Sequence, residues 1–364
     1  MKIAQITYSG FGGLGSVVFS LVQADINNTH DWIIGFLGDQ KLDRDYQNLS
    51  ENLKLPYASF TSKPRNPLLA WKSLFGWLSK QKPEAIICHT LNPVLVCRIY
   101  AWIYRIPLIA VEHTSNSIKP RNEKITSFIS MLLADRIVVL TDLYLIQMKA
   151  TFKSLLRSKK IVIIQNGIDL DFFYPVDKNA PCKQLVIGMA ARFTPSKKQD
   201  FLVSVLERIY ELEPNINLKL TFAGNGTELN RVKRIAESSS VARNITFEGL
   251  IEEKQIAPWM RNLDIYVHAT EGETLSTSIL QSMGCGIPII ASDVTGVANL
   301  LGHQNNLGYC IINDKDSFAK AIIKLLKDPH DQSRIANNVR KHAELYFGNT
   351  EMLNRYIKLI RSII

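Results

Sequence analysis

The chain has 364 residues, 46% of them hydrophobic and 21% charged, which is the composition of an ordinary folded protein. These values exclude a largely disordered chain, and the length favours two α/β domains over one. The formal net charge is +10, and residues 63–160 carry 16 Lys and Arg against 5 Asp and Glu, so we expect an anionic partner for this segment.

The sequence carries no signal for export, membrane crossing or metal binding. Residues 1–13 pass from a short apolar strand into glycines and lack the apolar core and cleavage site of a signal peptide. The longest uncharged stretch, residues 274–292, is too polar for a transmembrane helix. The five cysteines are scattered without CxxC pairing, so we expect reduced thiols. We therefore expect a cytoplasmic protein that begins at Met1 and has no membrane span.

Short apolar runs alternate with helical patterns along the whole chain. We expect strands at residues 2–8, 31–37, 85–89, 107–113, 136–140, 160–166, 184–191, 218–224, 244–249, 263–269 and 287–292. This alternation is typical of βαβ units with parallel sheets buried on both faces. The sequence therefore predicts two doubly wound α/β domains, at residues 1–178 and 179–348. Residues 349–364 form an amphipathic helix that we expect to pack back on the first domain.

A glycine-rich turn follows the first expected strand. Residues 10–15 read Gly-Phe-Gly-Gly-Leu-Gly, which fits G-x-G-x-x-G, and a helical pattern starts directly after them. Gly12 and Gly13 would let backbone N–H groups and a helix N-terminus approach an anionic ligand. Asp39, at the end of the second strand, lies at the distance expected of an NAD site. An NAD-dependent oxidoreductase is therefore one interpretation, and a tight turn without a ligand is another.

A basic, aromatic segment covers residues 63–82. Four apolar residues recur at helical spacing, and five basic residues accompany them: Leu68, Trp71, Phe75 and Leu78, with Lys63, Arg65, Lys72, Lys80 and Lys82. Such a helix can lie on an anionic membrane, although a core helix packed on the sheet would show the same spacing. Residues 149–160 of the same domain are also basic, and we therefore favour membrane contact.

Two cations follow the first strand of the second domain. Arg192 and Lys197 lie on the loop after residues 184–191, close to the start of a helix. Two fixed cations in this position can clamp a diphosphate. A solvated basic loop is the alternative when the segment is considered alone.

Further polar residues follow the strand at residues 263–269. Glu273 lies in a loop, Ser276 and Thr277 begin a helix, and Gln281 lies two turns along that helix. The carboxyl ends of parallel strands are where doubly wound sheets bind ligands, and the helix start offers N–H groups to a phosphate. Glu273 and Gln281 can both face one crevice and hold hydroxyls of an extended ligand. The alternatives are a solvated loop acid and an ordinary polar helix residue.

These motifs resemble those of the retaining glycosyltransferases of family 4, which have the GT-B fold. The family signature is a Glu, seven residues and a second Glu, followed by A-M-A-x-G-x-P-V-I-A. Here Glu273, seven residues and Gln281 precede Ser-Met-Gly-Cys-Gly-Ile-Pro-Ile-Ile-Ala. Further similarities are Arg-Phe-Thr-Pro-Ser-Lys at residues 192–197, Asn-Gly-Ile-Asp at 166–169, Gly-Asn-Gly at 224–226 and Phe-Glu-Gly at 247–249. The resemblance covers both domains and implies two Rossmann-like domains facing across a cleft.

The resemblance also implies roles in the second domain. Arg192 and Lys197 would neutralise the donor diphosphate, and Glu273 would hold hydroxyls of the donor sugar. The second acid of the signature would bind the nucleotide ribose, but here that residue is Gln281, which carries no charge. The replacement of this acid by Gln281 affects what the resemblance implies about ribose recognition and nucleotide preference.

In the first domain, His113 matches the family's histidine that faces the transferred sugar, and a buried structural histidine is the alternative. Gly12 and Gly13 match the loop near the diphosphate and the acceptor. We interpret Asp169 and Asp171 as structural rather than as a metal-binding DxD. The expected catalytic residues are Glu273, His113, Arg192 and Lys197. The expected nucleotide-sugar contacts are Gly12, Gly13, Arg192, Lys197, Glu273, Ser276, Thr277 and Gln281.

The expected reaction is the transfer of a hexose or N-acetylhexosamine with retention, without a cofactor or a metal. A UDP-sugar is the favoured donor and GDP-mannose the second. A lipid-diphosphate-linked saccharide in O-antigen or capsule assembly is the expected acceptor, which would place the protein at the inner face of a bacterial cytoplasmic membrane, on its anionic surface. A UDP-sugar epimerase of the same fold is the alternative, followed by the oxidoreductase. We expect no nucleic-acid partner, because the positive charge lacks a recognition module.

Overall fold

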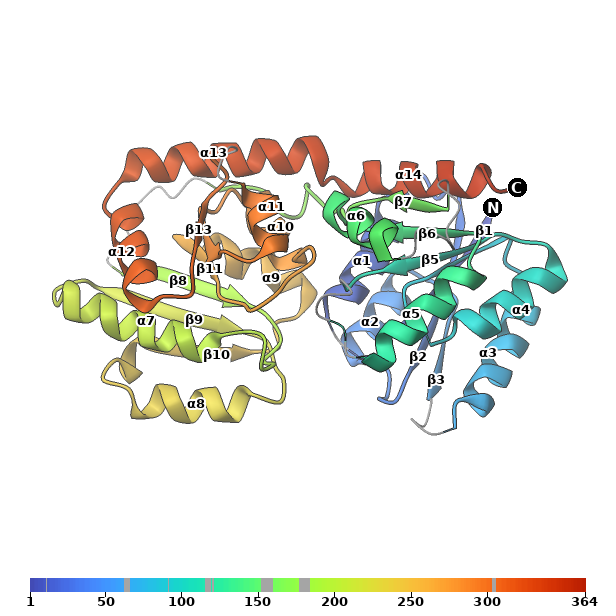
Figure 1. Ribbon diagram of the computed structural model, residues 1–364, viewed down its shortest axis with the longest axis horizontal. Helices are drawn as coiled ribbons and strands as arrows, with labels where there is room; N and C mark the ends of the chain where they lie inside the picture. The colour runs from blue at the N-terminus through green and yellow to red at the C-terminus, as the bar shows by residue number, and fades with distance from the viewer. Residues whose placement is uncertain are drawn as a thin grey trace. The chain divides into compact units, whose positions relative to one another are not determined.

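The structure is a computed structural model that describes residues 1–10, 12–61, 66–90, 92–114, 119, 121–151, 160–176, 184–302 and 306–364. Its contacts divide the chain into two compact units (Figure 1). The first consists of Met1–Gly167 with Asn349–Ile364, and the second of Ile168–Gly348. The expected domain boundary near residue 178 lies outside the described residues.

The first unit contains a seven-stranded sheet in the order β3-β2-β1-β4-β5-β6-β7. All neighbouring strands run parallel. The strands are β1 (Lys2–Thr7), β2 (Asp31–Gly38), β3 (Tyr57–Thr61), β4 (Ala85–Cys88), β5 (Leu108–Glu112), β6 (Arg136–Val139) and β7 (Ile161–Ile163). The order reverses between β1 and β4, and the carboxyl ends of strands at such a reversal are where doubly wound sheets bind ligands.

Helices cover both faces of this sheet. They are α1 (Gly13–Gln23), α2 (Arg44–Asn52), α3 (Leu68–Gln81), α4 (Val94–Tyr104), α5 (Arg121–Leu133), α6 (Asp142–Thr151) and α14 (Asn349–Arg361). One core cluster joins the sheet to α3, α4, α5 and α6. A second, around Phe19, Phe36 and Tyr46, joins it to α1 and α2.

The last helix, α14, belongs to the first unit and contacts α1. Its buried side chains include Met352, Tyr356 and Ile360. The Asn349 side chain donates to the Ser20 carbonyl at 3.3 Å, and the Ser20 hydroxyl donates to the Gly167 carbonyl at 3.2 Å. The end of the chain thus packs on the first helix.

The second unit contains a six-stranded parallel sheet in the order β10-β9-β8-β11-β12-β13. Its strands are β8 (Leu185–Ala190), β9 (Leu218–Ala223), β10 (Ile245–Gly249), β11 (Ile265–His268), β12 (Ile289–Ser292) and β13 (Tyr309–Ile311). Its helices are α7 (Gln199–Leu212), α8 (Leu229–Ser238), the short η1 (Ala242–Asn244), α9 (Glu253–Arg261), α10 (Thr277–Gly284), α11 (Thr295–Leu301), α12 (Lys315–Leu326) and α13 (Pro329–Tyr346). The order reverses between β8 and β11. The predicted α/β fold with two doubly wound parallel sheets is confirmed.

The helix expected to lie on a membrane, α3, turns its aromatic side chains inward. Leu78 is fully buried, and Trp71 and Phe75 are partly buried against the same core. Leu68 is 67% exposed. The prediction that Trp71, Phe75 and Leu78 face a membrane is therefore wrong, because their spacing reflects packing on the sheet. Lys63 and Arg65 lie outside the described residues.

Within the described part of the chain, no helix combines the length and the apolar character needed to cross a membrane.

Candidate active site

Two loops meet at the carboxyl ends of β8 and β11, where the order of the second sheet reverses. The Lys198 N–H donates to the Ala269 carbonyl at 3.1 Å, and the Glu271 N–H donates to the Ser196 carbonyl at 2.9 Å. Lys197 and Thr270 form an antiparallel bridge. These backbone bonds fix the β8–α7 loop against the β11–α10 loop, so that side chains 76 positions apart in the sequence can meet.

The Lys197 ammonium forms an ion pair with the Glu273 carboxylate. His268, the last residue of β11, lies beside both groups: its Nε2 is 3.2 Å from Glu273 Oε2 and 3.4 Å from Lys197 Nζ. Lys197 and Glu273 retain 17% and 18% of their side-chain exposure, whereas His268 is buried. The pair is therefore open to a ligand on one side and backed by an imidazole on the other.

The surroundings of Glu273 keep it ionised. Burial by itself raises the pKa of this carboxyl, but the hydrogen bond from His268 and the charge of Lys197 outweigh it and lower the pKa to about 2. Burial and the Lys197 charge lower the pKa of His268, against the opposing effect of Glu273. At neutral pH the Glu273 carboxyl is thus ionised and the His268 imidazole is neutral.

A second layer of polar groups supports His268. Its Nδ1 lies 3.2 Å from the Tyr266 hydroxyl, which also lies 2.8 Å from Ser278 Oγ. Ser276 Oγ is 3.1 Å from Ser278 Oγ. Sequence reasoning missed His268, Tyr266 and Ser278. The available signal was that His268, like His113, is a polar residue that ends a buried strand.

The remaining predicted residues of this unit lie around the pair. Arg192 is exposed, and its guanidinium has no ion-pair partner among the described residues. Ser276 precedes α10 and Thr277 begins it, which leaves the first N–H groups of this helix near the loop that carries Glu273. Gln281 is 9% exposed on the same helix. In the described part of the chain, the side-chain hydrogen bonds of Glu273 are to Lys197 and His268 and not to Gln281.

Glycine 296 allows the loop of Glu273 to lie close to α11. A Cβ added to Gly296 would lie 2.0 Å from the carbonyl oxygen of Glu273 and 2.8 Å from that of Thr274. Carbon and oxygen atoms cannot approach so closely. The position of the Glu273 backbone therefore depends on the absence of a side chain at residue 296.

One predicted site residue of the first unit, His113, lies beside a second histidine, His89. His113 Nε2 lies 3.2 Å from His89 Nδ1, and His89 Nε2 lies 3.0 Å from Gln5 Oε1. Gln5 donates its amide nitrogen to the Val18 carbonyl at 3.1 Å, which assigns Oε1 as the acceptor for His89. His89 then carries its proton on Nε2, and His113 donates from Nε2 and keeps a lone pair on Nδ1.

Both histidines are neutral. Burial lowers the pKa of His89 well below its usual value, with a smaller contribution from His113. Burial and the charge of Lys119 lower the pKa of His113 to about 3. Lys119 itself pairs with Glu112, next to His113 in β5. Among the described residues no group bonds to His113 Nδ1, and a neutral imidazole can accept there from a ligand hydroxyl.

The glycine turn is held by a tyrosine from α2. The Tyr46 hydroxyl accepts from the Gly12 N–H at 2.9 Å and donates to the Gly12 carbonyl at 2.5 Å. Gly13 is the first residue of α1. Asp39 accepts from the Tyr8 hydroxyl at 2.8 Å. The two groups that an NAD site would use, the Gly12 N–H and the Asp39 carboxylate, are thus each bonded to a tyrosine hydroxyl.

The Asp-Leu-Asp sequence at residues 169–171 stabilises a turn. Asp169 Oδ1 accepts from the N–H groups of Asp171 and Phe172 at 2.9 and 3.1 Å. Over the described ranges, no group of three or more His, Cys, Asp or Glu residues could hold a metal ion. Cys88, Cys97, Cys285 and Cys310 are free thiols, and Cys182 is outside those ranges.

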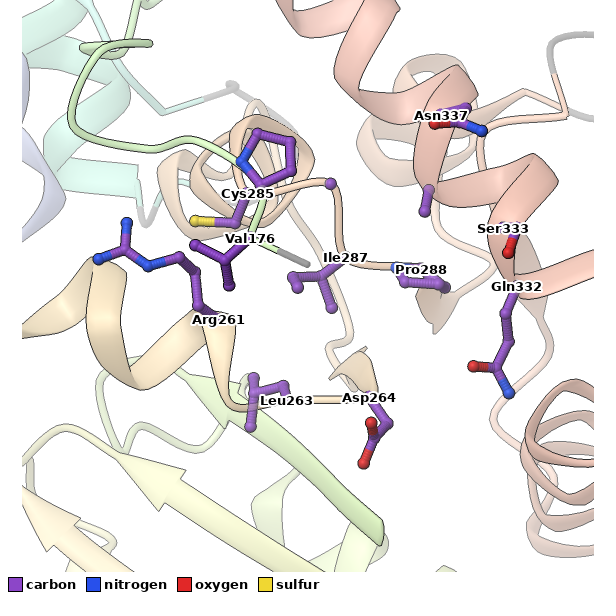
Figure 2. A pocket seen from close by; sticks show the side chains of 13 residues that line it. Val176, Arg261, Leu263, Asp264, Cys285, Ile287, Pro288, Gln332, Ser333 and Asn337 are labelled. Carbon is purple, nitrogen blue, oxygen red and sulfur yellow. The ribbon is translucent and has the colours of Figure 1, made fainter. Parts of the chain in front are cut away.

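A cavity of about 300 Å³ lies at the opposite end of the second sheet (Figure 2). Its lining includes the residues that precede β11 and β12 and part of α13. Three of its polar side chains have protein partners: Arg261 donates to the Phe172 carbonyl at 3.2 Å, Asp264 accepts from the Val186 N–H at 2.7 Å, and Gln332 donates to the Leu325 carbonyl at 2.8 Å. Because the cavity lies where β11 and β12 begin, it is separate from the Lys197–Glu273 pair, which lies at the carboxyl ends of the strands.

Two family models match the chain in succession. Residues 11–172 match Glycosyltransferase Family 4, and residues 173–342 match Glycosyl transferases group 1. Together they account for most of the chain.

Curated relatives are distant. The chain is 25% identical to D-inositol 3-phosphate glycosyltransferase 2 of Catenulispora acidiphila, over 58% of this chain and 52% of the relative. It is also 25% identical to a GDP-mannose-dependent monoacylated alpha-(1-6)-phosphatidylinositol monomannoside mannosyltransferase of Corynebacterium glutamicum, over 55% of each protein. The chain spans about half the length of these relatives.

Solved structures share the fold over the full length. HepE of Anabaena in complex with UDP and glucose matches with a TM-score of 0.82 at 19% identity, covering 100% of both chains. At that identity the likeness shows the fold, which is GT-B. With its two Rossmann-like units and both family matches, the chain belongs to family 4 of the glycosyltransferases.

Proposed function

We propose that this protein transfers a hexose or an N-acetylhexosamine from a nucleotide sugar, with retention of the anomeric configuration. The observation that carries the proposal is the ion pair of Lys197 and Glu273 at the reversal point of the second sheet. Cleavage of a sugar–phosphate bond leaves negative charge on the departing diphosphate, and a fixed cation stabilises it. A carboxylate held ionised beside that cation can accept hydrogen bonds from sugar hydroxyls.

Donor binding would exchange the partners of this pair. The diphosphate would replace Glu273 at the Lys197 ammonium, and the exposed guanidinium of Arg192 would supply a second cation. Glu273 would then turn to the sugar, and the N–H groups at the start of α10, with Ser276 and Thr277, would bind phosphate oxygens. His113, Gly12 and Gly13 would contribute from the first unit. None of these steps calls for a metal or another cofactor.

A UDP-sugar is the favoured donor. The structure of HepE contains UDP and glucose, which supports this choice. GDP-mannose is the second candidate, because the corynebacterial relative is named as dependent on it. The Gln281 amide can both donate to and accept from a ribose hydroxyl, whereas an ionised acid only accepts.

The proposed acceptor is a saccharide carried on a lipid diphosphate, in the assembly of O-antigen or capsule. The surplus of positive charge in residues 63–160 supports an anionic acceptor and an anionic membrane surface. The corynebacterial relative, whose name gives a phosphatidylinositol mannoside as its substrate, supports a lipid-linked one. The protein would then work at the inner face of the cytoplasmic membrane.

The test is to follow radiolabelled sugar from UDP-sugars and GDP-mannose into lipid extracts of a bacterium that makes surface polysaccharide. We expect label in an organic-phase product that mild acid releases, as for a diphosphate linkage, and an anomeric proton signal of the donor's configuration. Label that remains in a water-soluble UDP-sugar of altered configuration would indicate an epimerase instead. A product of opposite anomeric configuration would rule out retention.

A further inference from the structure

The helices on one face of the first sheet expose an unusual share of the protein's apolar side chains. Among the described residues, 20 large hydrophobic side chains are exposed, and 11 of them belong to α3, α4, α5 and α6. They are Leu68, Leu69, Leu95, Ile99, Trp102, Ile103, Tyr104, Ile125, Ile129, Leu132 and Ile146. Scattered exposed hydrophobics are ordinary, but a cluster of this kind marks an interaction surface.

The cluster is centred on α4. Trp102 and Ile103 lie three and four residues after Ile99, and the three side chains are 73%, 52% and 47% exposed. They therefore share one side of the helix, while Cys97 and Tyr100 on the other side are buried in the core. α4 is therefore not amphipathic, because its outward side is apolar like its inward side.

The neighbouring helix α5 continues this surface. α4 packs against α5 on one side and against α3 on the other (Figure 1). Ile125, Ile129 and Leu132 are spaced by four and three residues along α5 and are 46% to 56% exposed. We call the outward sides of these two helices, with Leu95, Ile99, Trp102, Ile103, Ile125, Ile129 and Leu132, the α4–α5 face.

The charges around the α4–α5 face are mostly positive. α3 and α4 contain no acidic residue, and Glu84 is the one acid between residues 63 and 104. Lys72 and Lys80 on α3, Arg105 after α4 and Lys124 on α5 are all exposed. A second copy of the chain docked here about a twofold axis would bring the same cations together. An anionic surface, in contrast, is complementary to them.

We propose that the α4–α5 face is the surface by which this protein docks on an anionic lipid bilayer. Trp102 and its aliphatic neighbours enter the boundary between headgroups and acyl chains, and the surrounding Lys and Arg bind lipid phosphates. This inference rests on the proposed function for the reason to be at a membrane. It assigns contact to α4 and α5, where the sequence had suggested the aromatic residues of α3.

The experiment measures sedimentation of the full chain with vesicles of phosphatidylcholine alone and of phosphatidylcholine mixed with phosphatidylglycerol. The test variant combines Ile99→Gln, Trp102→Gln and Ile129→Gln. A matched control combines Ile26→Gln, Ile312→Gln and Leu345→Gln, three residues that are 76%, 63% and 71% exposed elsewhere. We expect the test variant to lose at least about tenfold in partition coefficient on the anionic vesicles and the control variant to retain wild-type binding.

Two further measurements check that the variants are folded and locate the lipid contact. Thermal unfolding of both variants must match wild type, since all six positions are solvent-facing. A fluorescence shift of wild type on anionic vesicles, absent in Trp102→Phe, locates the contact at Trp102. Equal binding of the test variant and wild type would overturn the proposal, as would a lipid-free dimer in sedimentation equilibrium that the test variant abolishes. Vesicle binding requires no sugar transfer, so a chain that binds lipid but transfers no sugar would refute only the proposed function.

Discussion

At the scale of single residues, the site contains two Lys–Glu ion pairs that differ in burial. Two Lys–Glu pairs lie side by side on the same two loops: Lys197 with Glu273, and Lys198 with Glu271. In the first pair both side chains are mostly buried next to His268, whereas Glu271 is 59% exposed. The chain therefore offers its own control, because an exposed ion pair contributes little.

We predict that Glu273→Ala abolishes sugar transfer without unfolding the protein, and that Lys197→Ala and Arg192→Ala each cost about 2 to 4 kcal/mol of transition-state stabilisation. The reason is that these groups hold the sugar and the leaving diphosphate. Steady-state kinetics of the purified variants measure the effect. Lys198→Ala and Glu271→Ala are the controls and should stay within a few-fold of wild type; losses below tenfold in Lys197→Ala and Arg192→Ala would argue against the clamp.

The lowered pKa of the half-buried His113 predicts a pH dependence of stability. Its pKa is about 3 in the folded protein and 6.5 when unperturbed. Between these values the unfolded chain binds more protons, so stability is lost as the pH falls below 6.5, by up to about 1.4 kcal/mol per pH unit. Urea unfolding at pH 7.0 and below should show a steeper decline for wild type than for His113→Asn. If the free energy of unfolding declined equally with pH in both proteins, His113 would be protonated in the folded state as readily as in the unfolded one.

Sequence reasoning could find residues that follow strands, because every parallel strand points its carboxyl end at the same edge of the sheet. Glu273, Lys197 and His113 were predicted as site residues in this way. Tyr46 could not be found, since its contact with Gly12 joins residues 34 positions apart through the packing of α2. In the sequence, His268 is only the last residue of a buried strand. It becomes part of the site because the fold places Lys197 3.4 Å from its ring.

At the scale of elements, the burial of a strand determined whether it could be predicted from the sequence. Central strands such as β1 and β11 are covered on both faces and appear as continuous apolar runs. The two strands that were not predicted, β3 and β13, lie at the edges of their sheets. β3 is half exposed and β13 has three residues, so neither forms a continuous buried run. The opposite error occurred at α3, where one apolar spacing fitted both a core helix and a membrane helix.

The contact of α11 with the Glu273 loop gives a prediction at this scale. Gly296→Ala should displace the Glu273 carbonyl and lower donor affinity at least about tenfold, because the added Cβ overlaps a backbone oxygen that cannot rotate away. Isothermal titration with the donor measures the change.

Gly76→Ala in α3 is the matched control. Nothing lies within 4 Å of its added Cβ, so it should leave affinity unchanged and raise stability by up to about 1 kcal/mol. Unchanged donor affinity in Gly296→Ala would mean that the loop has room to shift.

At the scale of the whole molecule, the last helix returns to the first unit. Met352, Leu353, Tyr356 and Ile360 are each at most 6% exposed in α14, and α14 packs on α1. A chain that ends at Gly348 would uncover the side of α1 that α14 contacts.

We predict that deletion of residues 349–364 lowers the stability of the first unit by several kcal/mol, since each large apolar side chain contributes about 1.5 to 3 kcal/mol on burial. Calorimetry should show an earlier transition or insoluble protein. Deletion of residues 362–364 alone removes no fully buried side chain and should unfold as wild type does. An unchanged transition in the longer deletion would show that α14 is dispensable for folding.

The central claim is that the loops after β8 and β11 bind a nucleotide sugar through Lys197 and Glu273. The most direct measurement is the shift of the thermal unfolding midpoint of wild type and Lys197→Ala with UDP-glucose, UDP-N-acetylglucosamine, GDP-mannose and NAD. A bound donor at a hundred times its Kd adds about 2.7 kcal/mol of stability. We predict that a nucleotide sugar stabilises wild type, that Lys197→Ala loses most of this gain, and that NAD stabilises neither. Stabilisation by NAD alone, or an equal gain in both proteins with the nucleotide sugar, would contradict the account.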